Sequence, residues 1–229
     1  MRSRWAILAG ATAILAVIVG FARFMVRGPW IQAGSQEERP LEGLQVFGTV
    51  PPFSLIERSG TPVTRDDLMG NVWIVNFFYT HCPDTCPLQT ANMARLQRDL
   101  KDVKDLHLVS ITVDPERDTP PVLREYADRY EANPNRWLFL TGEKDAIYRL
   151  AQEGFRLSLV DPEQRVERRL FAPTPVFAHH GESGKRFIHS SRFVLVDSEA
   201  RIRGYYPGTD EEAFQRLRQD VRILLEREE

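Results

Sequence analysis

Residues 72–87 read VWIVNFFYTHCPDTCP, an apolar run followed by a loop that holds both cysteines of the chain. The first eight of these residues are continuous, β-branched and aromatic, which predicts a buried strand. Pro87 suits the first position of a helix, where a backbone N–H would have no partner. The segment from Cys82 to Thr85 is therefore expected to be a loop or irregular turn that joins a strand to a helix.

The rest of the chain predicts alternating strands and helices around this unit. Short β-rich apolar runs predict strands, and apolar residues at helical spacing predict helices. The expected strands cover 53–57 and 61–63 (a hairpin turning at Ser59-Gly60), 106–113, 137–140, 155–160, and a second hairpin of 192–197 with 201–206. The expected helices cover 87–101, 120–130, 143–153 with Gly154 as its C-cap, and 210–226. The segment 161–185, rich in Pro, Arg and Glu, is expected to be an inserted excursion.

This order of elements predicts one α/β domain. The sequence β-α-β-α-β-α, then a hairpin and a closing helix, favours a mixed sheet flanked by helices on both faces. A cysteine loop at the end of a central strand, opening a helix, makes the expected fold thioredoxin-like. We expect this domain to cover residues 47–229, after a polar tether at 28–46.

The first 27 residues are expected to be a membrane anchor. Between Trp5 and Ala22 the chain is apolar throughout, and about 18 such residues nearly match a bilayer core as a helix. A cleaved signal peptide is the alternative, but the residues after the run form a poor cleavage site. We expect a single transmembrane helix with the soluble domain on the outer, periplasmic or extracytoplasmic side, where a disulfide can persist. The net charge of −2 and the lack of a basic block give no reason to expect a nucleic-acid partner.

The two cysteines carry most of the functional signal. Thiols at positions 82 and 86 can bind one soft metal ion, close a disulfide, or do both in turn. One alternative is that both are merely small buried hydrophobes. Another is a purely structural disulfide, although closing so short a loop constrains the unfolded chain little. The nearby helix N-terminus lowers a thiol pKa and favours the reactive thiolate, so we favour a functional pair.

A metal at this site is expected to be copper. Structural zinc takes four protein ligands, whereas two thiolates and one imidazole form a soft set that suits Cu(I). The candidate imidazoles are those of His81, His107, His179, His180 and His189. His107 is expected to be an ordinary strand side chain, and His81 is expected to point away from its neighbour Cys82. The pair in the excursion is expected to be solvated, while His189 directly precedes the second hairpin and is the best placed.

A polar block, DPERDTP at 114–120, ends the second strand of the central sheet. A parallel neighbour would place it on the same sheet edge as the cysteine loop. The simplest interpretation is that Asp118 or Thr119 caps the helix that Pro120 opens. The alternative is a role in shaping the site or docking a partner.

Four blocks of this sequence resemble those of the Sco/SenC family of membrane-anchored copper chaperones. The blocks are FFYTHCPDTCP at 77–87, SITVDPERDT at 110–119, LTG at 140–142, and HS at 189–190. The resemblance extends over about 47–225 and implies a thioredoxin-like fold. It also implies that Cys82, Cys86 and His189 bind one copper ion, Cu(I) or Cu(II), and that the two cysteines form a redox disulfide.

The same resemblance implies a role in assembling the dinuclear copper centre of cytochrome c oxidase. The expected partners are the copper-bearing subunit of the oxidase or another copper carrier. One position departs from the family, which commonly has Asp where this chain has Ile188. An acidic neighbour could orient the imidazole of His189, so its absence bears on copper affinity.

Two classes of function remain open at this point. The first is a metallochaperone, which is a binding protein rather than an enzyme. The second is a thiol–disulfide oxidoreductase or thiol peroxidase that acts without metal, and redox sensing is a third alternative. All need Cys82 and Cys86, but only the first needs His189. The three-residue spacing between the cysteines differs from the two-residue spacing of thioredoxin-type enzymes, which favours the chaperone.

Overall fold

A computed structural model describes residues 44–157 and 191–226 of the chain. The chain divides into two units, 1–42 and 43–229, and all described residues belong to the second. The expected anchor and the expected excursion at 161–185 lie outside the described residues. Within the two described ranges, no helix combines the length and apolar character needed to cross a membrane.

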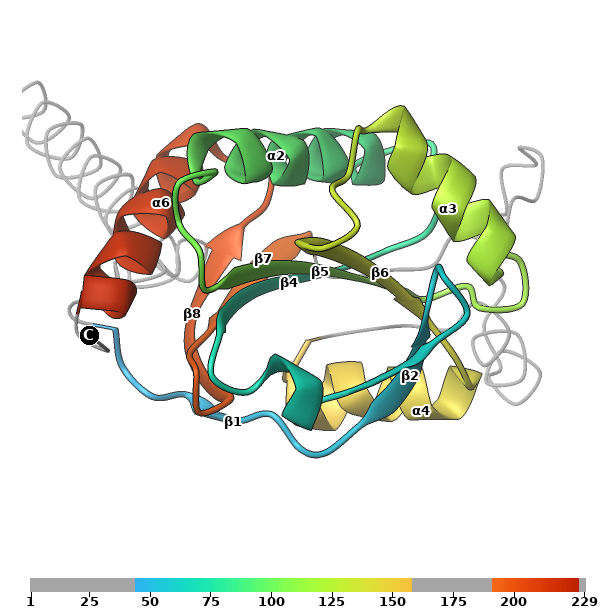
Figure 1. Ribbon diagram of the computed structural model, residues 1–229, viewed down its shortest axis with the longest axis horizontal. Coiled ribbons are helices and arrows are strands. Elements are labelled where there is room, and N and C mark those ends of the chain that lie inside the picture. Colours follow the sequence, from blue (N-terminus) through green and yellow to red (C-terminus); the bar gives the residue numbers. More distant parts are fainter. Residues whose placement is uncertain (1–43, 158–190, 227–229) are drawn as a thin grey trace, which may run out of the picture. The chain divides into compact units, whose positions relative to one another are not determined.

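The second unit is built on a single mixed sheet of eight strands (Figure 1). The strand order is β1-β8-β7-β4-β5-β6-β2-β3. The strands are β1 (Gly48–Thr49), β2 (Ser54–Glu57), β3 (Pro62–Thr64), β4 (Val72–Phe78), β5 (Leu106–Thr112), β6 (Trp137–Thr141), β7 (Arg192–Val196) and β8 (Arg201–Pro207). The helices are α2 (Cys86–Asp99), α3 (Pro120–Arg129), α4 (Lys144–Arg149) and α6 (Glu211–Glu226), with short turns at η2 (Asp66–Leu68) and η3 (Leu150–Gly154). The predicted mixed sheet with flanking helices is confirmed.

Three parallel strands form the centre of the sheet and position the cysteine loop. β4 pairs in parallel with β5, from Val72 opposite Leu106 to Phe78 opposite Thr112, and β5 pairs in parallel with β6. β7 runs antiparallel along the other side of β4. Since parallel strands end at the same edge, the loops that follow β4 and β5 are neighbours there.

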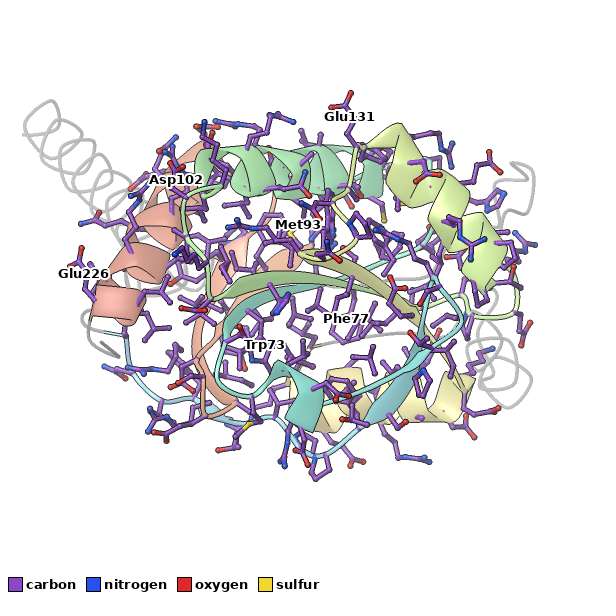
Figure 2. The ribbon with its side chains drawn as sticks, in the orientation of Figure 1. Trp73, Phe77, Met93, Asp102, Glu131 and Glu226 are labelled. Carbon is purple, nitrogen blue, oxygen red and sulfur yellow. The ribbon has the colours of Figure 1, made fainter. Side chains whose placement is uncertain are left out.

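The alternation of side chains along β4 fills a core on each face of the sheet. Trp73 and Phe77 lie on the opposite side of the sheet from Met93 of α2 (Figure 2). Both pack edge-on against Phe155, with ring centroids 6.2 and 5.5 Å apart. Phe78 points to the other face. Burying each such side chain stabilises the fold by roughly 1.5–3 kcal/mol.

Helices cover both faces of this sheet. α2 and α3 lie on the face of Met93, and α4 lies on the opposite face (Figure 1). On the first face, the ring of Phe78 lies 5.3 Å from that of Tyr126 in α3. The continuous apolar run of β4 therefore forms a strand with packed side chains on both faces of the sheet, as predicted from the sequence.

One predicted strand, at 155–160, is wrong where the structure describes it. The N–H of Phe155 donates to the carbonyl of Leu150 at 2.9 Å, so the chain there continues a helical turn instead of joining the sheet. That turn is the π-helical η3. Gly154 is its last residue rather than the C-cap, and Phe155 takes the cap position. Residues 158–160 lie outside the described part of the chain.

Candidate metal centre

The cysteine loop leaves the end of β4 as a tight turn and passes directly into α2. The N–H of Cys82 donates to the carbonyl of Tyr79 at 3.3 Å. α2 begins at Cys86, with Thr85 at its N-cap position and Pro87 in its first turn. The predicted strand–loop–helix arrangement is confirmed, with the second cysteine as the first helical residue.

The two thiols lie together and form no disulfide. Cys82 is 8% exposed and Cys86 is 1% exposed, and their side chains hydrogen-bond to each other. Burial opposes ionisation of Cys82, but hydrogen bonds from the Cys86 thiol, from the backbone N–H groups of Asp84 and Cys86, and from Tyr79 lower its pKa below the ordinary value. Burial and the hydrogen bond to Cys82 raise the pKa of Cys86. The pair thus offers one thiolate that forms readily beside one thiol that resists ionisation.

A buried carboxylate joins the start of the cysteine loop to the end of β5. Asp118 is fully buried, and its Oδ1 accepts a hydrogen bond from the Thr80 hydroxyl at 2.5 Å. Its Oδ2 accepts from the Thr80 N–H at 3.1 Å and from the Thr112 hydroxyl at 2.5 Å. The expectation that the 114–120 block lies beside the cysteine loop is confirmed.

The expectation that this block caps α3 through a side chain is wrong. Thr119 occupies the N-cap position, but no side chain makes a cap hydrogen bond there. The carboxylate of Asp118 is used elsewhere, because a buried carboxylate needs donors close by and the two strand ends supply three of them.

His81 faces solvent at the rim of the loop. Its Nδ1 lies 2.9 Å from the Thr80 hydroxyl, which already donates its one proton to Asp118. The imidazole must therefore donate to this hydroxyl from Nδ1. This arrangement agrees with the expectation that His81 points away from Cys82.

His107 lies well away from the cysteine pair. It pairs with Trp73 near the start of the parallel strands, five residues before the end of β5, or about 16 Å at 3.3 Å per residue. Burial lowers its pKa. The expectation that it is an ordinary packed strand side chain is confirmed.

The start of β7 lies against the cysteine loop. The hydroxyls of Thr85 and Ser191 are 3.2 Å apart, across 106 residues of sequence. The carbonyl of Ser191 accepts from the N–H of Gly208 at 2.7 Å. A Cβ on Gly208 would lie 2.8 Å from Cγ of Gln89 and 3.0 Å from the carbonyl oxygen of Ser191, so this seam between α2, β7 and β8 needs a glycine.

Gln89 is the least expected side chain at this seam. It is fully buried one turn after Cys86, and neither its amide nitrogen nor its amide oxygen has a hydrogen-bond partner among the described residues. Sequence reasoning missed Gln89, Ser191 and Gly208, and it assigned no role to Thr80, Thr85 and Thr112 although the quoted blocks contain them. Only their tertiary contacts identify them, because no spacing links such distant polar or small residues.

The expected third ligand is not among the described residues. His179, His180, Ile188 and His189 all lie outside residues 44–157 and 191–226. Within those ranges, no three His, Cys, Asp or Glu side chains cluster in a way that could hold a metal ion. The described part of the site is therefore the cysteine pair and its hydrogen-bonded support.

A cysteine pair between a central parallel strand and the helix that follows it, in a mixed sheet covered on both faces, defines a thioredoxin-like protein. Residues 43–225 match the SCO1/SenC family model, and the chain belongs to the SCO1/SenC family. The resemblance inferred from the sequence blocks is thus confirmed.

The comparison with individual proteins agrees. The SCO1 protein homolog of Bacillus subtilis is 31% identical over 175 residues, which are 76% of this chain and 81% of the relative. The solved structure of BsSco, described as a Sco-family cytochrome c oxidase assembly protein with a disulfide switch, has a TM-score of 0.64 at 29% identity and covers 79% of this chain and 95% of its own. ScoI of Bradyrhizobium japonicum, solved with copper bound, has a TM-score of 0.59 at 25% identity and covers 77% and 99%.

Proposed function

We propose that this protein is a copper chaperone that holds one copper ion through Cys82, Cys86 and His189. In this role it assists assembly of the dinuclear copper centre of cytochrome c oxidase. Copper is the cargo, and it passes to the copper-bearing subunit of the oxidase or to another copper carrier. The observation that carries the proposal is the buried, hydrogen-bonded pair of reduced thiols in the cysteine loop and at the first residue of α2.

The donor chemistry of this pair fits copper. Two thiolates four residues apart, almost excluded from water, form a soft site that favours Cu(I) over harder ions. The lowered pKa of Cys82 makes its thiolate easier to form than that of an ordinary thiol. Binding at Cys86 must displace a proton from a thiol whose pKa is raised, so copper affinity should increase with pH.

His189 is proposed as the third ligand because of where the described chain resumes. Ser191 is in hydrogen-bond contact with Thr85 inside the cysteine loop. His189 precedes Ser191 by two residues, which span at most about 7 Å of chain, and this short separation in sequence supports the proposal. An imidazole binds both Cu(I) and Cu(II), which would let the site hold either oxidation state.

The relatives support both copper binding and disulfide chemistry. One Sco structure was solved with copper bound, and another Sco protein is described as having a disulfide switch. We propose that Cys82 and Cys86 alternate between a copper-binding dithiol and a disulfide, which has no thiolate for copper.

The second candidate is a thiol–disulfide oxidoreductase that acts without metal. The opposite pKa shifts of the two thiols favour it, because a readily ionised Cys82 would attack a disulfide and Cys86 would resolve the mixed disulfide. This activity and copper delivery use the same thiols, and the role of His189 separates them.

We further propose that residues 1–27 anchor the protein in the cell membrane as a single transmembrane helix. The soluble domain would then lie on the outer, periplasmic or extracytoplasmic side. The apolar run between Trp5 and Ala22 supports this proposal.

An anaerobic Cu(I) titration of the reduced full-length protein in detergent tests the chaperone function. We expect about one Cu(I) per chain, near-complete loss in Cys82→Ser and Cys86→Ser, and only partial loss in His189→Ala. The thiolate-to-copper absorption band of the Cu(II) complex should change strongly in His189→Ala.

His107→Ala is the matched control, because His107 lies far from the thiols. Retention of zinc but not copper would contradict the proposal, and full Cu(II) binding by His189→Ala would reassign the third ligand.

A further inference from the structure

Asp118 is a buried carboxylate that is satisfied by hydrogen bonds alone. No side chain pairs with its charge among the described residues, and the neighbouring Arg117 lies 3.8 Å from Asp114 instead. Its three donors are the N–H and hydroxyl of Thr80 and the hydroxyl of Thr112. Such a group is costly to bury, and hydrogen bonds to a charged acceptor are the strong ones, so this arrangement resists distortion.

The donors belong to two different strand ends. Thr80 follows β4 and lies two residues before Cys82, whereas Thr112 is the last residue of β5. The N–H of Thr80 lies beyond the β4–β5 ladder, which ends at Phe78 and Thr112. Asp118 therefore fixes Thr80, near the start of the cysteine loop, against the neighbouring strand.

The loop that carries Asp118 is itself held in place. The N–H of Asp118 donates to the carbonyl of Asp114 at 2.9 Å. The N–H of Asp114 donates to the Thr112 hydroxyl at 3.0 Å, which leaves that hydroxyl free to donate its proton to Asp118. The carboxylate is thus positioned by β5 and acts on the loop after β4.

We propose that Asp118 is a positioning residue that holds the cysteine loop in its dithiol geometry. Through Thr80 it fixes the start of the loop, and through the loop it sets the separation of the two sulfur atoms. This proposal deepens the proposed function and rests on it for its copper arm only. Loss of the hydrogen bonds should weaken Cu(I) binding and shift the equilibrium dithiol + GSSG ⇌ disulfide + 2 GSH toward the disulfide.

Two substitutions separate hydrogen bonding from charge. Asp118→Asn keeps the shape: its oxygen can accept from the Thr80 N–H and the Thr112 hydroxyl, and its NH₂ can donate to the Thr80 oxygen. Asp118→Ala removes all three bonds. Asp67→Ala is the matched control, since Asp67 accepts the N–H and hydroxyl of Thr64 in the same manner at an exposed site after the edge strand β3.

The measurements use the full-length protein in detergent. We expect Asp118→Ala to shift the glutathione equilibrium constant and the Cu(I) dissociation constant by about tenfold or more, the usual effect of removing support from a metal ligand. Asp118→Asn should stay within about threefold of wild type on both constants, and Asp67→Ala should not differ from wild type. Circular dichroism tests whether each variant is folded.

Three results would overturn the proposal. The first is a folded Asp118→Ala protein whose two constants both stay within threefold of wild type. The second is a shift of the glutathione equilibrium toward the dithiol. The third is an equal shift in Asp118→Asn and Asp118→Ala, which would make the charge of Asp118 the cause.

A second pair of variants applies if Asp118→Ala does not fold. Thr80→Val must then shift the glutathione equilibrium toward the disulfide, and Thr80→Ser must restore it. No shift in Thr80→Val would also overturn the proposal. If wild type binds no Cu(I) but Asp118→Ala still shifts the glutathione equilibrium, the positioning role stands and the copper function fails.

Discussion

At the scale of single residues, the two cysteines are chemically unequal. Cys82 receives hydrogen bonds from the Cys86 thiol and from the backbone N–H groups of Asp84 and Cys86, which lower its pKa despite burial. Cys86 is more deeply buried and its pKa is raised. Cys82 is therefore the expected nucleophile in the oxidoreductase function and the expected first metal ligand in the chaperone function.

This inequality predicts the order in which the thiols react. With less than one equivalent of iodoacetamide, Cys82 should be alkylated first, because the thiolate is the reacting form. Its rate should rise with pH and reach half its maximum below pH 9.0, the ordinary thiol pKa. Peptide mass spectrometry of the reduced protein between pH 6 and 10 measures both sites. Cys86→Ala, which removes the side-chain hydrogen bond to Cys82, should raise the midpoint for Cys82. Preferential labelling of Cys86 would show that the inequality is reversed.

At the scale of elements, a buried polar chain ties together the three parallel strands. The Ser110 hydroxyl of β5 donates to Oδ1 of Asn76 in β4 at 2.7 Å. Nε1 of Trp137 in β6 donates to the same hydroxyl oxygen at 3.0 Å. All three side chains are buried, so the hydroxyl satisfies two groups that would otherwise be unpaired in the core.

Removing this hydroxyl should therefore destabilise the sheet. Ser110→Ala leaves one buried donor and one buried acceptor unsatisfied, at about 1–3 kcal/mol each, so we expect a loss of about 2–6 kcal/mol in the free energy of unfolding. Urea denaturation measures it. Ser54→Ala, on an exposed residue of β2, is the control and should change stability by less than about 0.5 kcal/mol. A Ser110→Ala protein as stable as the control would mean that water replaces the hydroxyl.

The elements that the sequence predicted well are those with a strong local pattern. The buried run of β4 and the proline-opened helices α2 and α3 lie within one or two residues of their expected bounds. The two-residue strand β1 was missed because its pairing with Ile202 of β8 is a tertiary contact without a pattern of its own. The residues from Phe155 onward are of types that favour strands, so a strand was predicted there. In the structure, Phe155 instead continues a helical turn, and its ring packs against Trp73.

The candidate site shows the same division. The cysteine pair and the neighbouring polar block could be found by spacing and by the parallel strand order. The role of Asp118 could not be found in this way. A helix cap and a buried carboxylate that joins two strand ends use the same residue types at the same position. Only the packing of β4 against β5 decides between them.

At the scale of the whole molecule, the apolar N-terminal run predicts that the protein stays attached to the membrane. Residues 5–26 should remain in the mature protein, because the run lacks a good cleavage site and nearly spans a bilayer. The full-length chain should stay with membranes after high-salt and alkaline extraction, while a chain that starts at Gly34 should not. Fractionation with N-terminal sequencing tests this. A mature N-terminus between Gly28 and Gly34 would instead identify a cleaved signal peptide.

The whole domain should also report copper binding through its stability. A ligand that binds only the folded state adds about 2.7 kcal/mol when its free concentration is 100 times its Kd. For a domain of this size, each kcal/mol raises the Tm by about 2–4 °C, so buffered Cu(I) should raise the Tm of the reduced protein by about 5–10 °C. Differential scanning calorimetry under anaerobic conditions measures the shift.

Oxidation provides the matched control for this shift, because the disulfide form keeps the same chain but has no thiolates. Cu(I) should leave the Tm of the oxidised protein unchanged, and the same should hold for the reduced Cys82→Ser, Cys86→Ser double variant. His189→Ala should show a smaller shift than wild type when tested at the same free Cu(I) concentration, since the thiolates alone would hold the ion less tightly. An equal rise in Tm for the oxidised and reduced proteins would place copper somewhere other than the cysteine pair and would contradict the proposed site.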